Sequence, residues 1–175
     1  MLTSLSYNIV NVLTKGGNIV SQVRGIWRYA NNVIKFARQM VNEDLQPLQL
    51  SSAEGNILLH LLTTEEILRQ EDLVEELEIS KPAVSRALRS LEKKGFVQRK
   101  KDPEDRRVSR ICLTGKALEK GPAIEEVYEN LFQQAAQDIS EEEIKEFIEL
   151  FKRISENFLL AREKREKEGA KNDSK

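Results

Sequence analysis

One predicted helix carries side chains that suit hydrogen bonding to the edges of DNA bases. The helix is expected over residues 81–94, and its exposed face holds six polar side chains: Lys81, Ser85, Arg86, Arg89, Ser90 and Lys93. Arg86 can donate two hydrogen bonds to O6 and N7 of a guanine in the major groove. Ser85 can bond to a base or a phosphate, and the first backbone N–H groups of the helix suit a phosphate.

This basic face also has an ordinary explanation. Exposed helix faces often carry charge only because they are solvated. Arg86 and Arg89 would then pair with Glu92 or with the acidic helix that precedes them. Lys93 and Lys94 lie too far along the helix to read bases, so we expect them to meet the DNA backbone or water.

A charged turn follows the helix and is the second candidate contact. It reads Asp-Pro-Glu-Asp-Arg-Arg over residues 102–107, and Pro and Asp favour a turn. A guanidinium at the tip of a thin hairpin can enter the minor groove, where the electrostatic potential is most negative. An acid two residues earlier can hold that guanidinium extended through a bidentate pair. The alternative is an ordinary charged hairpin.

These side chains depend on a specific order of elements. Ser80 is predicted to cap the basic helix, Pro82 suits its first turn, and Gly95 is predicted to end it. A short acidic helix and two strands are predicted at residues 70–77, 96–100 and 108–113. Helix, tight turn, basic helix and hairpin in this order predict a winged helix-turn-helix over residues 50–114.

Long amphipathic helices are predicted on both sides of this domain, over residues 26–46 and 115–163. The apolar stripe from Ile144 to Phe158 needs a partner surface. Packing on the winged domain would supply one, and so would a helical dimer interface. A two-fold dimer also places two recognition helices about 34 Å apart, one turn of DNA, which suits a palindromic site. We therefore expect both segments to be dimerisation helices.

Local signals predict where the flanking helices begin and bend. Ser51 with Glu54, and Ser140 with Glu143, have the spacing of capping boxes. Gly121-Pro122 should kink or break its helix. The chain ends are predicted as a helical N-terminal extension at residues 1–25 and a disordered tail at residues 164–175. The fold class is therefore mainly α with a small β wing.

The net charge of -1 over 175 residues hides a strong asymmetry. Residues 81–110 hold eleven Lys/Arg and four Asp/Glu, so 11 - 4 = +7. Residues 65–79 hold one Arg and seven acids, so 1 - 7 = -6. A local block of positive charge is typical of a nucleic-acid site, because neutralising phosphates releases counterions.

Other residue types argue against several classes of protein. The only cysteine, Cys112, has no partner for an internal disulfide, which fits a reducing compartment. The only histidine, His60, lies in an apolar helix and is predicted to be structural, so no metal or cofactor is expected. No Gly-rich phosphate loop is present, which argues against an enzyme. Residues 1–25 suit neither a signal peptide nor a membrane span, so we expect a cytoplasmic, nucleoid-associated protein.

The motifs together resemble the multiple antibiotic resistance regulator (MarR) family. They are Ile79-Ser80-Lys81-Pro82-Ala83-Val84-Ser85-Arg86, Leu91-Glu92-Lys93-Lys94-Gly95-Phe96-Val97, Asp102-Pro103-Glu104-Asp105-Arg106-Arg107 and Leu113-Thr114. The resemblance covers about residues 26–160 and implies an obligate homodimer of winged helix-turn-helix subunits that represses or sometimes activates transcription. It implies that Asp105 and Arg107 form the wing pair, with Arg107 in the minor groove. The candidate DNA-binding residues are Lys81, Pro82, Ser85, Arg86, Arg89, Asp105, Arg106 and Arg107.

Three features depart from the family pattern. The first 25 residues exceed its usual start. Glu78 stands where glycine is usual in the turn, and a left-handed conformation there would cost a glutamate about 1 kcal/mol. Arg69 stands where a capping Ser or Thr is common before the acidic helix.

The resemblance also implies partners. These are double-stranded DNA with a pseudo-palindromic operator, a second copy of the chain and a small-molecule effector, with no membrane. An effector pocket between the dimer helices and the winged domain could use Trp27, Tyr29, Phe36 and Met40, although such residues at helical spacing are more often core. Cys112 is expected to be structural rather than an oxidant sensor. The competing class is a winged-helix protein-interaction module without specific DNA binding, and Arg106 and Arg107 argue against it.

Overall fold

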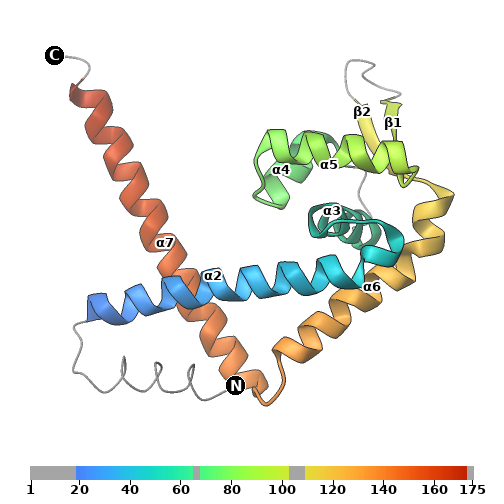
Figure 1. Cartoon of the computed structure of the whole chain (residues 1–175). Coiled ribbons are helices and arrows are strands. Elements are labelled where there is room, and N and C mark those ends of the chain that lie inside the picture. The colour runs from blue at the N-terminus through green and yellow to red at the C-terminus, as the bar shows by residue number, and fades with distance from the viewer. Residues whose placement is uncertain (1–18, 65–67, 103–108, 173–175) are drawn as a thin grey trace. The chain divides into compact units, whose positions relative to one another are not determined.

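The computed structural model describes residues 19–64, 68–102 and 109–172. Its elements, shown in Figure 1, are α2 (Ile19–Asp44), the 3-10 helix η1 (Gln46–Leu48), α3 (Ser52–Thr63), α4 (Gln70–Glu76), α5 (Lys81–Lys94), β1 (Val97–Lys101), β2 (Ser109–Leu113), α6 (Gly115–Ala135) and α7 (Glu141–Asn172). They fall into two units, and the boundary along the chain lies between Leu131 and Phe132, within α6. The elements confirm the predicted fold class, a mainly helical chain with a two-stranded wing.

The first unit is built around one apolar core. Helix α3 contributes Ile57 and Leu58, and α5 lies across it with a face of buried leucines. The fully buried large side chains are Leu45, Ile57, Leu58, Leu73, Val84, Leu88, Leu91, Phe96 and Ile124. They come from α2 or its C-terminal end, α3, α4, α5, the start of the wing and α6, so this core fixes the helix-turn-helix and its neighbours as one body.

Helix α5 spans the predicted residues, but the side-chain cap predicted at its start is missing. Gly95 follows it with φ 75°, a left-handed conformation that glycine adopts without steric cost. The hydroxyl of Ser80 makes no capping hydrogen bond, so the predicted side-chain cap is wrong. The Ser80 carbonyl instead accepts hydrogen bonds from the N–H groups of Ala83 and Val84 at 2.9 and 3.1 Å. Pro82 fits the first turn because it has no backbone donor to satisfy.

The wing is an antiparallel pair of strands in which Val97 lies opposite Leu113 and Lys101 opposite Ser109. Strand β1 begins one residue later than predicted, and β2 is described from Ser109, because the predicted first residue, Val108, lies outside the described residues. The segment before α4 adds a further pairing, because the N–H of Ile111 donates to the Leu68 carbonyl at 2.8 Å. The base of the wing is thereby tied to the start of α4.

Helix α6 continues through Pro122, so the expected break does not occur. Gly121 is buried, and a Cβ at this position would lie 3.0 Å from Cδ2 of Leu62 in α3. The glycine therefore lets α6 pass close to α3, and this packing supports the helix where proline removes a backbone hydrogen bond.

The second unit contains α7, which begins with the predicted capping box. The N–H and hydroxyl of Ser140 both donate to Glu143 at 2.8 Å, and the N–H of Glu143 donates back to the Ser140 hydroxyl at 3.2 Å. The helix runs to Asn172, so the disorder expected from residue 164 is not found. Lys, Arg and Glu are good helix formers, and Arg162 pairs with Glu166 one turn later at 2.9 Å.

Apolar side chains are exposed on two of the flanking helices. On α2 they include Trp27, Val33, Ile34 and Phe36, and on α7 they include Phe147, Ile148, Phe158 and Leu160. Within the described residues, no helix combines the length and apolar character needed to cross a membrane.

Candidate nucleic-acid interface

The structure places the predicted base-reading residues on the outer face of α5. Arg86 and Arg89 are exposed, and Ser85 is half-buried between them and the core side of the helix. Arg89 Nη2 donates a hydrogen bond to the Ser85 hydroxyl oxygen at 3.3 Å. Among the described residues, Arg86 forms no hydrogen bond or ion pair, so its five N–H donors face solvent.

The ion pairs around this face differ from the sequence-based alternative for Arg86 and Arg89. Glu92 pairs with Arg99 of β1 at 3.4 Å. The acidic helix α4 reaches the basic helix through Glu71, which lies 3.1 Å from Nζ of Lys81. The hydrogen bond from Lys81 holds the pKa of Glu71 below its usual value. Of the basic side chains on α5, it is therefore Lys81, rather than Arg86 or Arg89, that pairs with α4.

The turn between α4 and α5 contains a residue in an unfavourable backbone conformation. Glu78 has φ 50°, in the left-handed region that favours glycine. Its N–H donates to the carbonyl of Glu75 at 3.3 Å. Glu78 therefore adopts the left-handed conformation that costs a residue with a Cβ about 1 kcal/mol.

The start of α4 lacks a side-chain cap, as expected from an arginine at this position. Arg69 occupies the capping position, and its side chain makes no capping hydrogen bond. Its backbone N–H donates to Oδ2 of Asp72 at 2.6 Å, which supplies half of a capping box from the helix side.

The C-terminal end of α5 is attached to the body of the domain by Lys94. Its Nζ donates to Oε1 of Glu54 at 2.6 Å and to the Gln49 carbonyl at 2.7 Å. The expectation that Lys94 meets the DNA backbone or water is therefore wrong. The signal was absent from local sequence because Lys94 and Glu54 are 40 residues apart.

Glu54 performs two tasks at once. Its Oε2 accepts hydrogen bonds from the N–H and the hydroxyl of Ser51 at 2.7 and 2.8 Å, which confirms the predicted capping box of α3. Burial alone would raise the pKa of Glu54, but hydrogen bonds from Lys94, Ser90 and Ser51 outweigh it and lower that pKa. The carboxylate is thus stabilised in its charged form inside the domain.

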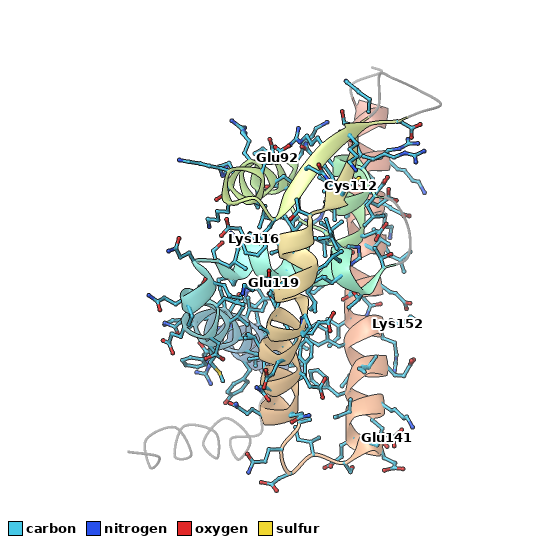
Figure 2. The ribbon with its side chains drawn as sticks, turned by 90° about the vertical axis from the view of Figure 1, so that its right-hand side faces the viewer. Glu92, Cys112, Lys116, Glu119, Glu141 and Lys152 are labelled. Atoms are coloured by element: carbon cyan, nitrogen blue, oxygen red, sulfur yellow. The ribbon has the colours of Figure 1, made fainter. Side chains whose placement is uncertain are left out.

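Side chains from the start of α6 complete the attachment. Lys116, labelled in Figure 2, donates to the Lys94 carbonyl at 2.7 Å. The Thr114 hydroxyl donates to the carbonyls of Gly95 and Phe96 at 2.7 and 3.1 Å. Lys116 thus satisfies a carbonyl that the end of α5 leaves without an intrahelical partner, and Thr114 holds the two residues that follow the helix.

The predicted wing contacts Asp105, Arg106 and Arg107 lie outside the described residues. The base of the wing lies within the described residues and contains an ion pair. Asp102 is buried, and its Oδ2 lies 2.5 Å from Nε of Arg110. This pair joins the residue after β1 to β2, at the two ends of the segment that carries the predicted minor-groove residues.

A cavity of about 390 Å³ lies between the start of α4 and the wing strands. Its lining residues are Arg69, Gln70, Glu71, Asp72, Arg99, Ser109 and Ile111. Nη2 of Arg99 donates to Oε1 of Gln70 across it at 3.3 Å. No local sequence signal indicates this cavity, because its walls come from segments that only the folded wing brings together.

The candidate effector residues do not form a closed pocket in the single chain. Trp27 is 66% exposed, Phe36 is 54% exposed and Tyr29 is also exposed. Met40 is half-buried near the end of α2. Their role stays a prediction, and it requires a second surface that covers α2.

His60 links two helices, whereas the structural role expected for Cys112 stays a prediction. Nε2 of His60 lies 2.5 Å from Oε2 of Glu76, so the histidine links α3 to α4. Cys112 is a free, half-buried thiol on β2. No cluster of three potential metal ligands occurs in the residues that the structure covers.

A tight turn, an exposed basic helix and a two-stranded wing define a winged helix-turn-helix protein. Residues 50–109 match the MarR family, the same family that the sequence motifs resemble.

A curated relative of the chain is a transcriptional regulator. The chain is 32% identical over 100 residues to YdgJ, an uncharacterized HTH-type transcriptional regulator of Bacillus subtilis (strain 168). That match covers 57% of this chain and 61% of YdgJ, less than two thirds of the relative's length.

Two solved structures show how far the fold extends. The transcriptional regulator SlyA superposes with a TM-score of 0.70 at 24% identity, covering 76% of this chain and 93% of SlyA. The S. aureus MepR–DNA complex has a TM-score of 0.67 at 26% identity, covering 74% of this chain and 97% of MepR. The similarity therefore includes most of the chain and not only residues 50–109.

Proposed function

We propose that this protein is a homodimeric, sequence-specific DNA-binding transcriptional regulator. The observation that carries the proposal is the reading face of α5, on which Arg86 is exposed without a partner among the described residues while the opposite face is buried in the core. A side chain that is free in the unbound protein can bond to a base without first breaking an internal contact. The similarity to MepR, whose structure includes DNA, supports the same function.

In this proposal α5 enters the major groove and the wing approaches the minor groove. Arg86 donates to a guanine, while Ser85 and Arg89 reach a base or a phosphate. Lys81 and Pro82 lie at the end of α5 that enters first, where backbone N–H groups favour a phosphate. Arg107, held by Asp105 and with Arg106 beside it, supplies the minor-groove contact.

The proposed dimer uses the apolar surfaces of α2 and α7. Trp27 and Phe36 on α2, and Phe147 and Phe158 on α7, are large apolar side chains that are each more than half exposed. A second copy of the chain would cover such surfaces and present two copies of α5 to a pseudo-palindromic operator. The protein in this proposal acts in the cytoplasm, has no enzymatic activity and represses transcription until a small-molecule effector binds beside α2.

Selection of bound duplexes from random DNA at fixed salt tests this function. We expect an enriched, two-fold symmetric site, and Arg86→Ala should relax base preference at one position in each half-site, by about 1–3 kcal/mol. Lys152→Ala on α7 is a control, because it removes a positive charge far along the chain from the reading helix. Failure to enrich any sequence, together with binding that does not depend on salt, would instead favour the protein-interaction module.

A further inference from the structure

The two ends of α5 are held very differently. At the N-terminal end, Ser80 gives no side-chain cap and the Lys81–Glu71 pair has both side chains about two thirds exposed, at 66% each. At the C-terminal end, Lys94 binds the buried carboxylate of Glu54. Exposed pairs constrain a helix weakly, whereas a buried pair allows little freedom. The helix is therefore held firmly at its C-terminal end and only weakly at its N-terminal end.

The buried pair is geometrically restrictive. The side chain of Glu54 is 6% exposed, and a buried carboxylate is costly unless its partners stay in place. One oxygen of Glu54 is committed to the Ser51 cap and the other to Lys94. Any shift of the end of α5 relative to the first turn of α3 must therefore break either the helix cap or the ion pair.

The C-terminal end of α5 and the start of α3 are also hydrogen-bonded to other elements of the first unit. The Gln49 carbonyl that accepts from Lys94 precedes α3, in a residue with φ 56°. Oδ1 of Asn42 in α2 accepts from the N–H of Ser52 at 2.7 Å, next to the capping box. Lys116 of α6 donates to the Lys94 carbonyl. The end of α5 is thus set relative to both long helices of this unit.

We propose that Lys94 and Glu54 are positioning residues that set the angle of the reading face and so determine how well the protein distinguishes its operator from other DNA. Lys94 in this role contributes to specificity without touching a phosphate. The inference rests on the DNA-binding function proposed above, and it adds a residue pair that lies on the protein side of the helix.

Lys94→Met and Lys93→Met form a matched test, since both remove one positive charge from the same turn of α5 and Lys93 is exposed. Affinities are measured for the duplex selected by the wild type and for a scrambled duplex, at several salt concentrations. The double variant Glu54→Gln/Lys94→Met removes the buried charge together with its partner, which guards against loss of folding. Circular dichroism verifies that each variant is folded.

We expect Lys94→Met and the double variant to lower the ratio of specific to non-specific affinity by about tenfold, the lower end of what one base contact contributes. The slope of log affinity against log salt should not change for Lys94→Met. Lys93→Met should leave the ratio unchanged. An equal loss on both duplexes with a slope lowered by about one would show that Lys94 meets a phosphate, and would overturn the proposal.

Two further outcomes separate this inference from the proposed function. If the wild type selects a sequence and folded Lys94→Met keeps its ratio, the pair is only structural and the inference alone fails. If the wild type selects no sequence, the proposed function fails, and amide NMR spectra of the DNA-free protein decide the positioning role. In those spectra, signals of the N-terminal half of α5 should move in Lys94→Met and stay in place in Lys93→Met. Unmoved signals in both variants would overturn it.

Discussion

The hydroxyl of Tyr128 in α6 donates a hydrogen bond to Oδ1 of Asn56 in α3 at 2.6 Å. Burial raises the pKa of Tyr128, so the phenol stays neutral and keeps its proton for this bond. The adjacent Gly55 allows the contact, because it leaves room for the phenol and for Leu45 at the end of α2. One glycine therefore lies where α2, α3 and α6 meet.

Gly55→Ala should destabilise the fold. A Cβ there would lie 2.4 Å from Cδ1 of Leu45 and 2.7 Å from the Tyr128 hydroxyl oxygen. Overpacking of this kind costs about 1–3 kcal/mol, measured as the free energy of unfolding in urea. Gly115→Ala is the control, because a Cβ at Gly115 meets nothing within 4 Å. Equal stability of the two variants would contradict the close packing described here.

Glu78→Gly should raise the melting temperature. The left-handed conformation at Glu78 is unfavourable for a residue with a Cβ, and glycine removes that strain while losing some chain entropy. The net gain should be about 0.5–1 kcal/mol. Glu75→Gly, inside α4, is a matched control that should lower stability by about 1 kcal/mol. A lower melting temperature for Glu78→Gly would show that the turn has no strain to release.

The contribution of Glu54 should depend on pH in a defined direction. Its pKa in the folded protein lies below the ordinary value of 4.5, so folding is favoured when the carboxyl is charged. This stability is fully present above pH 4.5 and is lost as pH falls through the lower, folded-state value. Glu54→Gln should therefore cost about 1–3 kcal/mol at neutral pH and progressively less in acid.

Urea unfolding of wild type and Glu54→Gln at a series of pH values measures this difference. Glu125→Gln, at an exposed position on α6, controls for the general effect of removing one acid. A difference between wild type and Glu54→Gln that persists unchanged well below pH 4.5 would refute the charged pair as its source.

Glu71→Gln should strengthen DNA binding slightly. Glu71 holds Lys81 at 3.1 Å in the free protein, and the pair competes with a phosphate for the same ammonium. Exposed pairs are worth at most about 1 kcal/mol, so the affinity should rise by about twofold. Fluorescence anisotropy at low salt measures it, with Glu119→Gln as the control, because Glu119 pairs with Lys120 on α6. A weaker complex for Glu71→Gln would mean that the pair orients Lys81 productively.

Arg107→Ala should weaken binding to many sequences alike. A guanidinium in the minor groove adds electrostatic attraction with little base discrimination, and its loss should cost about 1–3 kcal/mol. Competition binding with several duplexes measures this loss. Lys101→Ala, on the wing strand, tests whether any positive charge nearby has the same effect. A loss confined to one sequence would assign Arg107 to base reading instead.

The sequence predicted most elements of the first unit because their signals are local. Ser51 and Glu54 are three residues apart, and Gly95 lies directly after the helix it ends. The doubt about Glu78 was also local, since one residue in a turn of known shape determines the strain. Ser80 shows the limit of such signals, because a residue type that is able to cap a helix need not have its hydroxyl turned toward the helix.

The long-range contacts could not be predicted. A lysine near the end of a basic helix is expected to meet solvent or a phosphate. Only the fold reveals that Lys94 turns inward to Glu54. The pairing of Leu68 with Ile111, and the cavity beside it, likewise depend on segments far apart in sequence. The roles of Ser85, Arg86 and Arg107 on DNA remain predictions.

The attachment of α5 at one end makes the helix behave as a lever. Arg86 lies about 12 Å from Lys94 along the helix axis, at 1.5 Å per residue. A rotation of about 5° at the fixed end would therefore displace the Arg86 backbone by about 1 Å, more than the 0.5 Å range of good hydrogen-bond lengths. Small changes in how α2, α3 and α6 converge are thus amplified at the DNA, so substitutions far from the groove can retune the operator without altering any residue that touches it.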